Sequence, residues 1–198
     1  MNISMDQIKE LREKTSAGIS DCKKALETAN GCIEKAVEEL RKKGLATAQK
    51  KAGRSTNQGI VEIYLHHDHQ LGVMVELNCE TDFVANTKEF RELAKKIAMQ
   101  IALDSPIYVD KDAIPAEIVE KEKCLYREQL QQEKKPANVL EKILEGKVEA
   151  FYKANCLLDL PTMADPKLTI RDIITDTVGK LQENITVRRF IRFKLGEE

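Results

Sequence analysis

Several features that mark whole classes of protein are missing from this 198-residue sequence. No stretch approaches the roughly 18 consecutive apolar residues that a membrane-spanning helix requires. The first residues lack a basic segment followed by an apolar core, so we expect no secretory signal and a cytoplasmic location. The formal net charge is only -1, so no global field draws the chain to nucleic acid or to an anionic membrane.

Cysteine pairs and catalytic motifs are also missing. The five cysteines are scattered without a Cys-x-x-Cys pair, which is typical of reduced, mostly buried thiols. There is no Gly-x-Ser-x-Gly elbow, no Walker A loop and no Gly-x-Gly-x-x-Gly run, so a hydrolase is not favoured, and we expect no cofactor. A zinc site at His66, His67 and His69 is an alternative to a solvated turn, but adjacent histidines lack the spaced pairs of a tetrahedral site. We therefore expect no bound metal.

The residues that are present indicate a globular protein. Hydrophobic residues make up 42% of the chain and charged residues 33%, which is too apolar a balance for a disordered chain. The length fits one large domain or one small and one medium domain.

Residues 4–44 show three short apolar stripes with the 3.6-residue period of helices. Ser4 and Gln7 have the spacing of a capping box. Ser20 is expected to cap the second helix, and Gly44 to end the third as a left-handed C-cap. Helices of about ten residues are not stable alone. We therefore expect them to pack into a three-helix module with loops suited to docking on a partner.

The segment 41–54 carries six basic residues and no acidic one. We interpret it as a solvated linker or helix tail between domains, and a contact strip for an acidic partner is the alternative. Aromatic residues do not interleave with the basic ones, so nucleic-acid binding is less favoured. The expected division is a helical domain with its basic linker at 1–54 and a second domain at 55–198.

In the second domain the hydrophobic period changes from 3.6 to 2. Alternating runs at 61–65 and 73–79, joined by a polar turn, predict an antiparallel hairpin. The apolar stripe at 90–102 predicts a long helix capped by Asn86.

The remainder of the chain predicts more helices and one more strand. Residues 115–156 are typical of a helical hairpin broken at Pro136, Thr169 begins a further helix, and 185–195 predicts a final strand. The fold class is therefore α+β, with a three-stranded antiparallel sheet packed against helices. A sheet this small leaves edges or a face uncovered, which favours self-association through it.

Three stretches go beyond pattern and carry a resemblance. Residues 11–26 read Leu-Arg-Glu-Lys-Thr-Ser-Ala-Gly-Ile-Ser-Asp-Cys-Lys-Lys-Ala-Leu, 78–86 read Asn-Cys-Glu-Thr-Asp-Phe-Val-Ala-Asn, and 183–190 read Glu-Asn-Ile-Thr-Val-Arg-Arg-Phe. All three resemble sequences of the elongation factor Ts family. They occur in the family's order and span nearly the whole chain, so a chance match to all three is not credible.

The resemblance implies a non-enzymatic guanine-nucleotide exchange factor in translation elongation. Its partner would be elongation factor Tu (EF-Tu), bound in the GDP-loaded and nucleotide-free states. It would promote release of GDP and Mg²⁺ and stabilise the vacant state until GTP binds. The implied fold is a three-helix N-terminal domain of the ubiquitin-associated (UBA) type followed by an α+β core. The length resembles the family's short form, which acts as a homodimer.

The resemblance also implies a binding corner made by Thr81, Asp82, Phe83 and Val84. Asp82 is expected to approach the magnesium side of the EF-Tu nucleotide site, and Phe83 to wedge between side chains of two EF-Tu helices. Taken by pattern alone, the same four residues read as a strand end with Phe83 in the core and Asp82 as a helix cap.

Docking by the N-terminal domain is implied for Arg12, Ile19, Ser20 and Lys23. The family often has Gly-Ala-Gly-Met-Met where this chain has Ser-Ala-Gly-Ile-Ser at 16–20. Ile19 thus keeps an apolar anchor, whereas Ser20 loses one.

A general adaptor is the rival hypothesis. Its three-helix module would bind ubiquitin-like or nascent-chain partners. This hypothesis accounts for the first domain but leaves the segment 81–86 unexplained.

Overall fold

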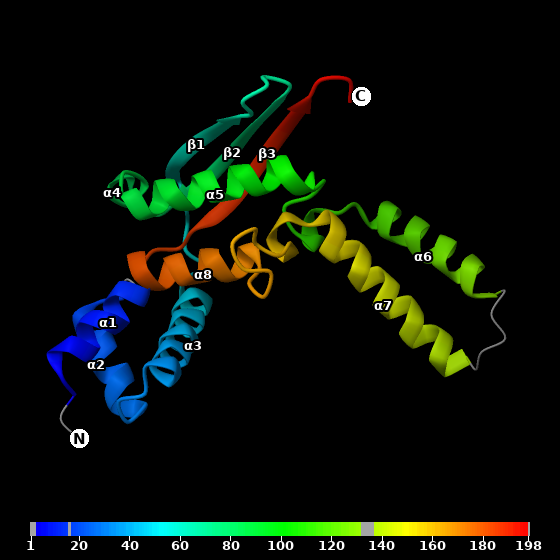
Figure 1. Ribbon diagram of the computed structural model, residues 1–198. Coiled ribbons are helices and arrows are strands. Elements are labelled where there is room, and N and C mark those ends of the chain that lie inside the picture. The colour runs from blue at the N-terminus through cyan, green and yellow to red at the C-terminus, as the bar shows by residue number, and fades with distance from the viewer. Residues whose placement is uncertain (1–2, 16, 132–136, 198) are drawn as a thin grey trace. The chain divides into compact units, whose positions relative to one another are not determined.

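The computed structural model describes residues 3–15, 17–131 and 137–197 (Figure 1). Its α-helices are α1 (Met5–Thr15), α2 (Ile19–Thr28), α3 (Ile33–Lys51), α4 (Asp82–Ala85), α5 (Lys88–Asp104), α6 (Ala116–Gln131), α7 (Ala137–Asn155) and α8 (Ile170–Leu181). The strands are β1 (Gln58–Leu65), β2 (Leu71–Cys79) and β3 (Thr186–Lys194), and two short 3-10 helices are η1 (Lys111–Ala113) and η2 (Leu157–Asp159).

The chain divides into two compact units, each assembled from separate segments. The first contains the residues up to Glu62 together with Glu76–Ala94 and Asp172–Val187, and the second contains Ile63–Val75, Lys95–Arg171 and Arg188–Glu198. Each unit contains part of all three strands, so each is built from residues far apart in the sequence.

Helices α1 to α3 enclose their own small core. Ile8, Leu11, Cys22 and Leu26 are among its buried side chains. The predicted capping box is present, because the Gln7 N–H donates to Ser4 Oγ at 3.2 Å and the Ser4 N–H donates to Gln7 Oε1 at 3.0 Å. These bonds satisfy two helix-start N–H groups.

Two predictions about the ends of these helices were wrong. Helix α2 begins at Ile19 after Gly18, without a side-chain cap, so Ser20 lies inside the first turn. Helix α3 passes through Gly44 and ends at Lys51, so the basic segment 41–51 is the helix tail. Gly44 is buried where α8 crosses α3, and a Cβ on Gly179 would lie 3.1 Å from the Gly44 Cα. The missing side chain of Gly179 therefore allows α8 to approach α3 closely at Gly44, and Gly44 lies within α3 rather than ending it.

The predicted three-stranded antiparallel sheet is confirmed, with strand order β1-β2-β3 (Figure 1). The His66 N–H donates to the Leu71 carbonyl at 2.8 Å and closes the hairpin, and the Leu195 N–H donates to the Gln70 carbonyl at 2.8 Å. Alternate residues of the central strand β2, from Val73 to Cys79, are buried.

Helix α5 carries the long buried stripe that the sequence predicts, including Phe90, Ile97 and Ile101. Its cap was predicted wrongly. The Phe90 N–H donates to Thr87 Oγ1 at 3.3 Å, so Thr87 caps the helix. Asn86 is the last residue of the preceding turn, following α4.

Helices α6 and α7 pair as the predicted hairpin, with Lys147 Nζ 5.3 Å from the centre of the Tyr126 ring. The predicted break at Pro136 lies outside the described residues. Helix α8 follows Thr169 as expected. Among the described residues, no helix has the length and apolar character needed to cross a membrane.

Candidate partner-binding site

The corner between β2 and α4 is a single tight turn of helix following a strand. Strand β2 ends at Cys79, and α4 occupies only Asp82–Ala85. Thr81 is its N-cap, and the Thr81 hydroxyl oxygen accepts the Val84 N–H at 3.4 Å. A four-residue helix has no stability of its own, so its geometry depends on this cap and on its neighbours.

Phe83 projects from this corner into solvent. Its side chain is 82% exposed, more than any other large apolar side chain in the described part of the chain. Asp82 beside it is also exposed. The alternative interpretation, with Phe83 in the core and Asp82 as the cap, is therefore wrong on both points, because Thr81 supplies the cap.

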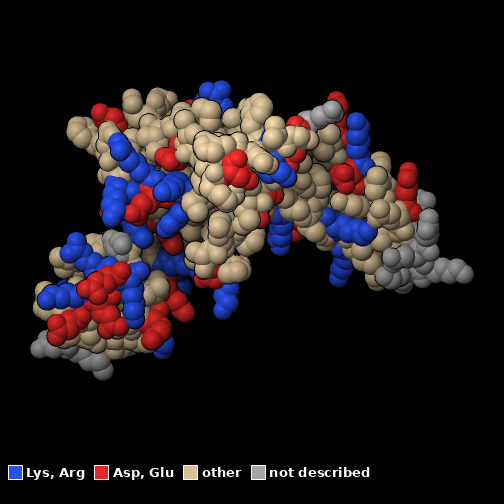
Figure 2. All heavy atoms as spheres, turned by 45° about the horizontal axis from the view of Figure 1, so that its top comes forward, with Lys and Arg blue, Asp and Glu red and all other residues tan. Residues whose placement is uncertain are grey.

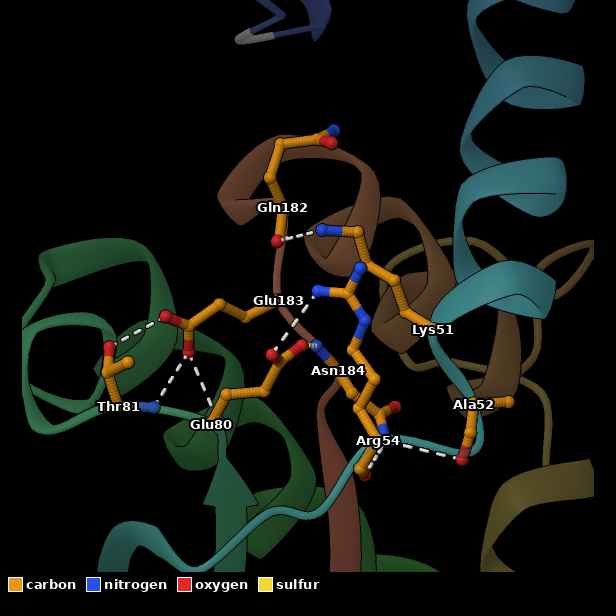
Figure 3. A network of polar contacts seen from close by, with 8 residues as sticks. All are labelled: Lys51, Ala52, Arg54, Glu80, Thr81, Gln182, Glu183 and Asn184. Carbon is orange, nitrogen blue, oxygen red and sulfur yellow. Dashed lines mark hydrogen bonds and ion pairs between the residues drawn. The ribbon is translucent and has the colours of Figure 1, made fainter.

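The carboxylate of Glu183 holds the start of the corner (Figure 3). Glu183 Oε2 accepts the N–H groups of Glu80 at 3.1 Å and Thr81 at 3.0 Å. Its Oε1 accepts the Thr81 hydroxyl at 2.6 Å. Three donors from two adjacent residues thus converge on one side chain, and charge-assisted bonds of this kind are stronger than neutral ones.

Glu80 makes the reciprocal contact. Its Oε1 accepts the Asn184 N–H at 2.7 Å, and Arg54 Nη1 lies 3.4 Å from its Oε2. The Asn184 N–H, with a smaller contribution from Arg54, lowers the pKa of Glu80. Two adjacent strand ends therefore exchange carboxylate-to-backbone hydrogen bonds in both directions.

The segment after α3 joins the same network (Figure 3). The Asn184 side-chain amide donates to the carbonyls of Ala52 at 3.3 Å and Arg54 at 2.9 Å. Lys51 Nζ donates to the Gln182 carbonyl. These contacts fix the end of the basic segment beside the corner.

Cys79 lies beneath the corner and is fully buried. Its Sγ is 3.1 Å from the Thr81 carbonyl oxygen. Burial, followed by the nearby Glu183 charge, raises the pKa of the Cys79 thiol to about 11. The thiol therefore acts as a small packing group rather than as a nucleophile.

The predicted docking residues of the N-terminal helices all lie at the surface. Ile19 is 54% exposed, and Arg12, Ser20 and Lys23 are also exposed. Ile19 and Lys23 are four residues apart on α2 and so share one face of the helix. Figure 2 shows acidic and basic side chains intermingled over this helical module.

The histidine turn offers no arrangement for a metal. His66 Nδ1 lies 2.9 Å from the Tyr64 hydroxyl oxygen, and the rings of His66 and His67 are 4.3 Å apart. Among the described residues, no group of three or more His, Cys, Asp or Glu side chains is placed to hold a metal ion.

A second exposed surface lies on the part of the sheet in the second unit. The hydrogen bonds from the His66 N–H to the Leu71 carbonyl and from the Leu195 N–H to the Gln70 carbonyl fix how the three strands pair. Followed along the strands, this pairing places Ile63, Met74 and Ile191 side by side, on the face opposite the buried side chains. We call these residues and their neighbours the outer sheet face. All of them are exposed: Ile63, Leu65, Met74, Ile191, Phe193 and Leu195.

Sequence reasoning missed the network that supports the corner. Thr81 and Glu183 are 102 residues apart, so no spacing pattern links them. The available signal was the resemblance of the segment 183–190, which indicated only a strand.

Comparison with known proteins places the whole chain in one group. The family model described as "Elongation factor TS" matches residues 2–197. The chain is 55% identical to "Elongation factor Ts" of Fervidobacterium nodosum over 197 residues, which cover 100% of both chains. It is 54% identical to the protein of the same name from Thermotoga maritima, over 100% of this chain and 98% of that one.

Proposed function

The chain belongs to the elongation factor Ts family, and from this premise we propose that it is a guanine-nucleotide exchange factor for EF-Tu in translation elongation. It binds EF-Tu·GDP, promotes release of GDP and Mg²⁺, and stabilises the nucleotide-free partner until GTP binds. It is not an enzyme, because exchange requires no covalent step. It acts in the cytoplasm.

The thermodynamic requirement is a preference for the vacant partner. A GTPase holds GDP mainly through phosphate contacts and Mg²⁺. Linkage is reciprocal, so a factor that binds the vacant state more tightly weakens GDP binding by the same factor. The exchange factor therefore needs a group that fits EF-Tu only when the nucleotide site is distorted.

The observation that carries the proposal is the exposure of Phe83 on a corner held by hydrogen bonds. An aromatic ring kept in water gains ~1.5–3 kcal/mol on entering an apolar gap of a partner. Asp82, next to it, brings a negative charge to the magnesium side of the site, while Thr81 and Val84 shape the turn. The corner thus offers an apolar wedge and a charge within one helical turn.

Docking is assigned to the N-terminal domain, residues 1–54, which we propose is UBA-like. Ile19 provides an apolar anchor on the nucleotide domain of EF-Tu, and Arg12, Ser20 and Lys23 surround it. The core, residues 55–198, presents the corner. Neither role involves direct contact with nucleic acid or membrane.

Self-association is assigned to the outer sheet face. Six exposed apolar side chains lie on one face of three neighbouring strands, and monomeric proteins rarely leave large apolar patches in water. We propose a homodimer through this face of the core sheet.

The deciding experiment is stopped-flow release of fluorescent GDP from the cognate EF-Tu. Phe83→Ala is expected to slow stimulated release at least several-fold, because the variant loses the transfer free energy that the ring gains in the partner's apolar gap. Leu125→Ala, which truncates an exposed side chain on α6, is the matched control and should leave the rate unchanged. An unaltered rate for Phe83→Ala, with the fold intact, would reject the wedge.

The adaptor hypothesis makes a different prediction. A pull-down from lysate should retain EF-Tu and release it when excess GDP and Mg²⁺ are added. Retention of ubiquitin-like or nascent-chain partners in place of EF-Tu would support the adaptor instead.

A further inference from the structure

We propose that Glu183 is a positioning residue for nucleotide exchange. Its carboxylate holds the segment 80–84 in the conformation that presents Phe83 to EF-Tu. The inference rests on the proposed exchange function, and it assigns a role to a residue that itself need not touch the partner.

The first argument is the placement of the three hydrogen bonds. Glu183 accepts two successive backbone N–H groups, from Glu80 and Thr81, and the Thr81 hydroxyl, at 2.6–3.1 Å. These donors lie where the chain leaves β2 and before α4 begins. The carboxylate therefore sets the direction in which the short helix starts.

The second argument is that one of these bonds also orients the helix cap. The Thr81 hydroxyl has one hydrogen and two lone pairs. Donating that hydrogen to Glu183 leaves the lone pairs for the Val84 N–H, which lies 3.4 Å away. Glu183 thus fixes the rotation of the hydroxyl that caps α4.

The third argument is that Phe83 makes too little contact to orient itself. With 82% of its side chain exposed, its direction follows from the backbone of a four-residue helix. Such a helix is stable only through tertiary contacts and capping. A wedge held in its binding conformation before it meets the partner loses less entropy on binding.

The reciprocal contact supports the same role. Glu80, the residue whose N–H Glu183 accepts, returns a bond to the N–H of Asn184 at 2.7 Å. The end of β2 and the residues before β3 are therefore tied in both directions. Glu183 acts from a fixed position rather than from a free side chain.

Two substitutions separate the hydrogen bonds from the charge. Glu183→Ala removes all three acceptor contacts. Glu183→Gln keeps one carbonyl oxygen for the two N–H groups, and its amide can donate to the Thr81 oxygen. The glutamine variant should therefore retain most of the corner geometry without the charge.

The first readout is the concentration dependence of GDP release from EF-Tu. Glu183→Ala is expected to lower the maximal stimulated rate about tenfold. The concentration that gives half of that rate should stay within about twofold, because docking through the N-terminal helices is intact. Glu183→Gln should recover the maximal rate to within about threefold of the unmodified protein.

The second readout is a double-mutant comparison. If Glu183 acts through the wedge, adding Glu183→Ala to Phe83→Ala should slow release by less than about twofold further. A full tenfold loss in the Phe83→Ala background would mean that Glu183 acts by another route, and it would overturn the proposal.

The third readout needs no partner. Hydrogen exchange of the amides of Glu80, Thr81 and Val84 should accelerate at least tenfold in Glu183→Ala, while the buried amides of α5 keep their protection. If the corner amides keep their protection, Glu183 does not hold the corner and the inference fails. Should Glu183→Ala fail to fold, Thr81→Val removes the hydroxyl's bond to Glu183 together with the cap that it provides to the Val84 N–H, and it should slow release about threefold.

The outcomes distinguish this inference from the proposed function. Corner amides that loosen without any change in GDP release, while Phe83→Ala slows release, would overturn the inference and leave the function intact. A Phe83→Ala variant with an unchanged rate would overturn the wedge and the role of Glu183 in exchange together.

Discussion

Phe83 in the first unit and Phe193 in the second are both exposed, at 82% and 72%, but their surroundings differ. Phe83 stands on a single turn of helix that begins at a network of polar hydrogen bonds. Phe193 lies on a strand among five other exposed apolar side chains of the outer sheet face. A single aromatic group on a hydrogen-bonded corner suits insertion into a partner's gap. A broad apolar face suits permanent burial against a second copy.

The contrast shows why exposure alone does not assign a function. Burying one ring gains ~1.5–3 kcal/mol, which is enough to bias a binding equilibrium without making the complex permanent. An apolar face of several side chains can bury several times the surface area of a single ring, as stable dimers require. A functional assignment for Phe83 therefore depends on the polar network that holds the corner as well as on the exposure of the ring.

The largest expected effect comes from a third phenylalanine, Phe90, which is fully buried in α5. Phe90→Ala is expected to lower the free energy of unfolding by ~3–5 kcal/mol, because it removes a core side chain and leaves a cavity. Phe83→Ala should change it by less than ~0.5 kcal/mol, since that side chain is in water. Urea unfolding followed by circular dichroism measures both. A comparable loss in Phe83→Ala would mean that its ring is packed rather than presented.

The second prediction tests the other side of the comparison. Phe193→Asp places a charge in the proposed dimer interface and should raise the dimer dissociation constant at least ~100-fold, because an unpaired charge is costly to bury. Leu125→Asp on α6 is the matched control and should leave association unchanged. Sedimentation velocity at tens of micromolar distinguishes the two states. A strictly monomeric unmodified chain would contradict the assignment of this face.

The third prediction compares the reactivity of two thiols, one buried under the corner and one exposed on α6. Cys124 is exposed on α6, whereas Cys79 is buried under the corner and has a pKa of about 11. Only the thiolate reacts, so at pH 8 the rise in the pKa of Cys79 from the ordinary value near 9 to about 11 lowers its own reactive fraction ~100-fold. Iodoacetamide labelling followed by mass spectrometry should therefore modify Cys124 first. Raising the pH toward 11 should increase Cys79 labelling as long as the protein stays folded. Equal labelling at pH 8 would show that the corner opens frequently.

The smallest expected effect concerns the charge beside the wedge. Asp82→Asn should slow stimulated GDP release ~2- to 5-fold, because it removes the negative charge but keeps the shape of the corner. The deficit should disappear when Mg²⁺ is removed with EDTA, since the proposed target of that charge is the magnesium environment. A deficit that persists without Mg²⁺ would assign Asp82 to the protein contact instead.

Sequence reasoning predicted the elements whose signals are local. The box formed by Ser4 and Gln7 requires only neighbouring residues, and the alternation of the hairpin strands is visible within each strand. Gly44 was misjudged because its role depends on Gly179, which is 135 residues away. Asn86 and Thr87 are adjacent candidates for one cap, and pattern alone does not rank them.

The candidate site also has a part that the sequence indicated and a part that depends on residues far apart in the chain. The sequence resemblance indicated Thr81 to Val84 as a binding corner, and pattern alone would have placed Phe83 in the core. The support from Glu183 could not be predicted, because it depends on the final strand returning beside β2. Likewise, the alternation in the strands showed two faces of the sheet but not which of them lacks a cover.

The crossing of α3 and α8 at Gly44 and Gly179 has a practical consequence for dividing the chain. A fragment cut after residue 54 would keep its three helices but would lose α8, which covers α3 at Gly44. A side chain at Gly179 would place its Cβ 3.1 Å from the Gly44 Cα, so α3 or α8 would have to shift, whereas a Cβ at Gly44 would make only an ordinary contact, 4.0 Å from the Thr175 carbonyl oxygen. Fragments meant to report on docking alone would therefore best retain residues 172–187 as a covering segment.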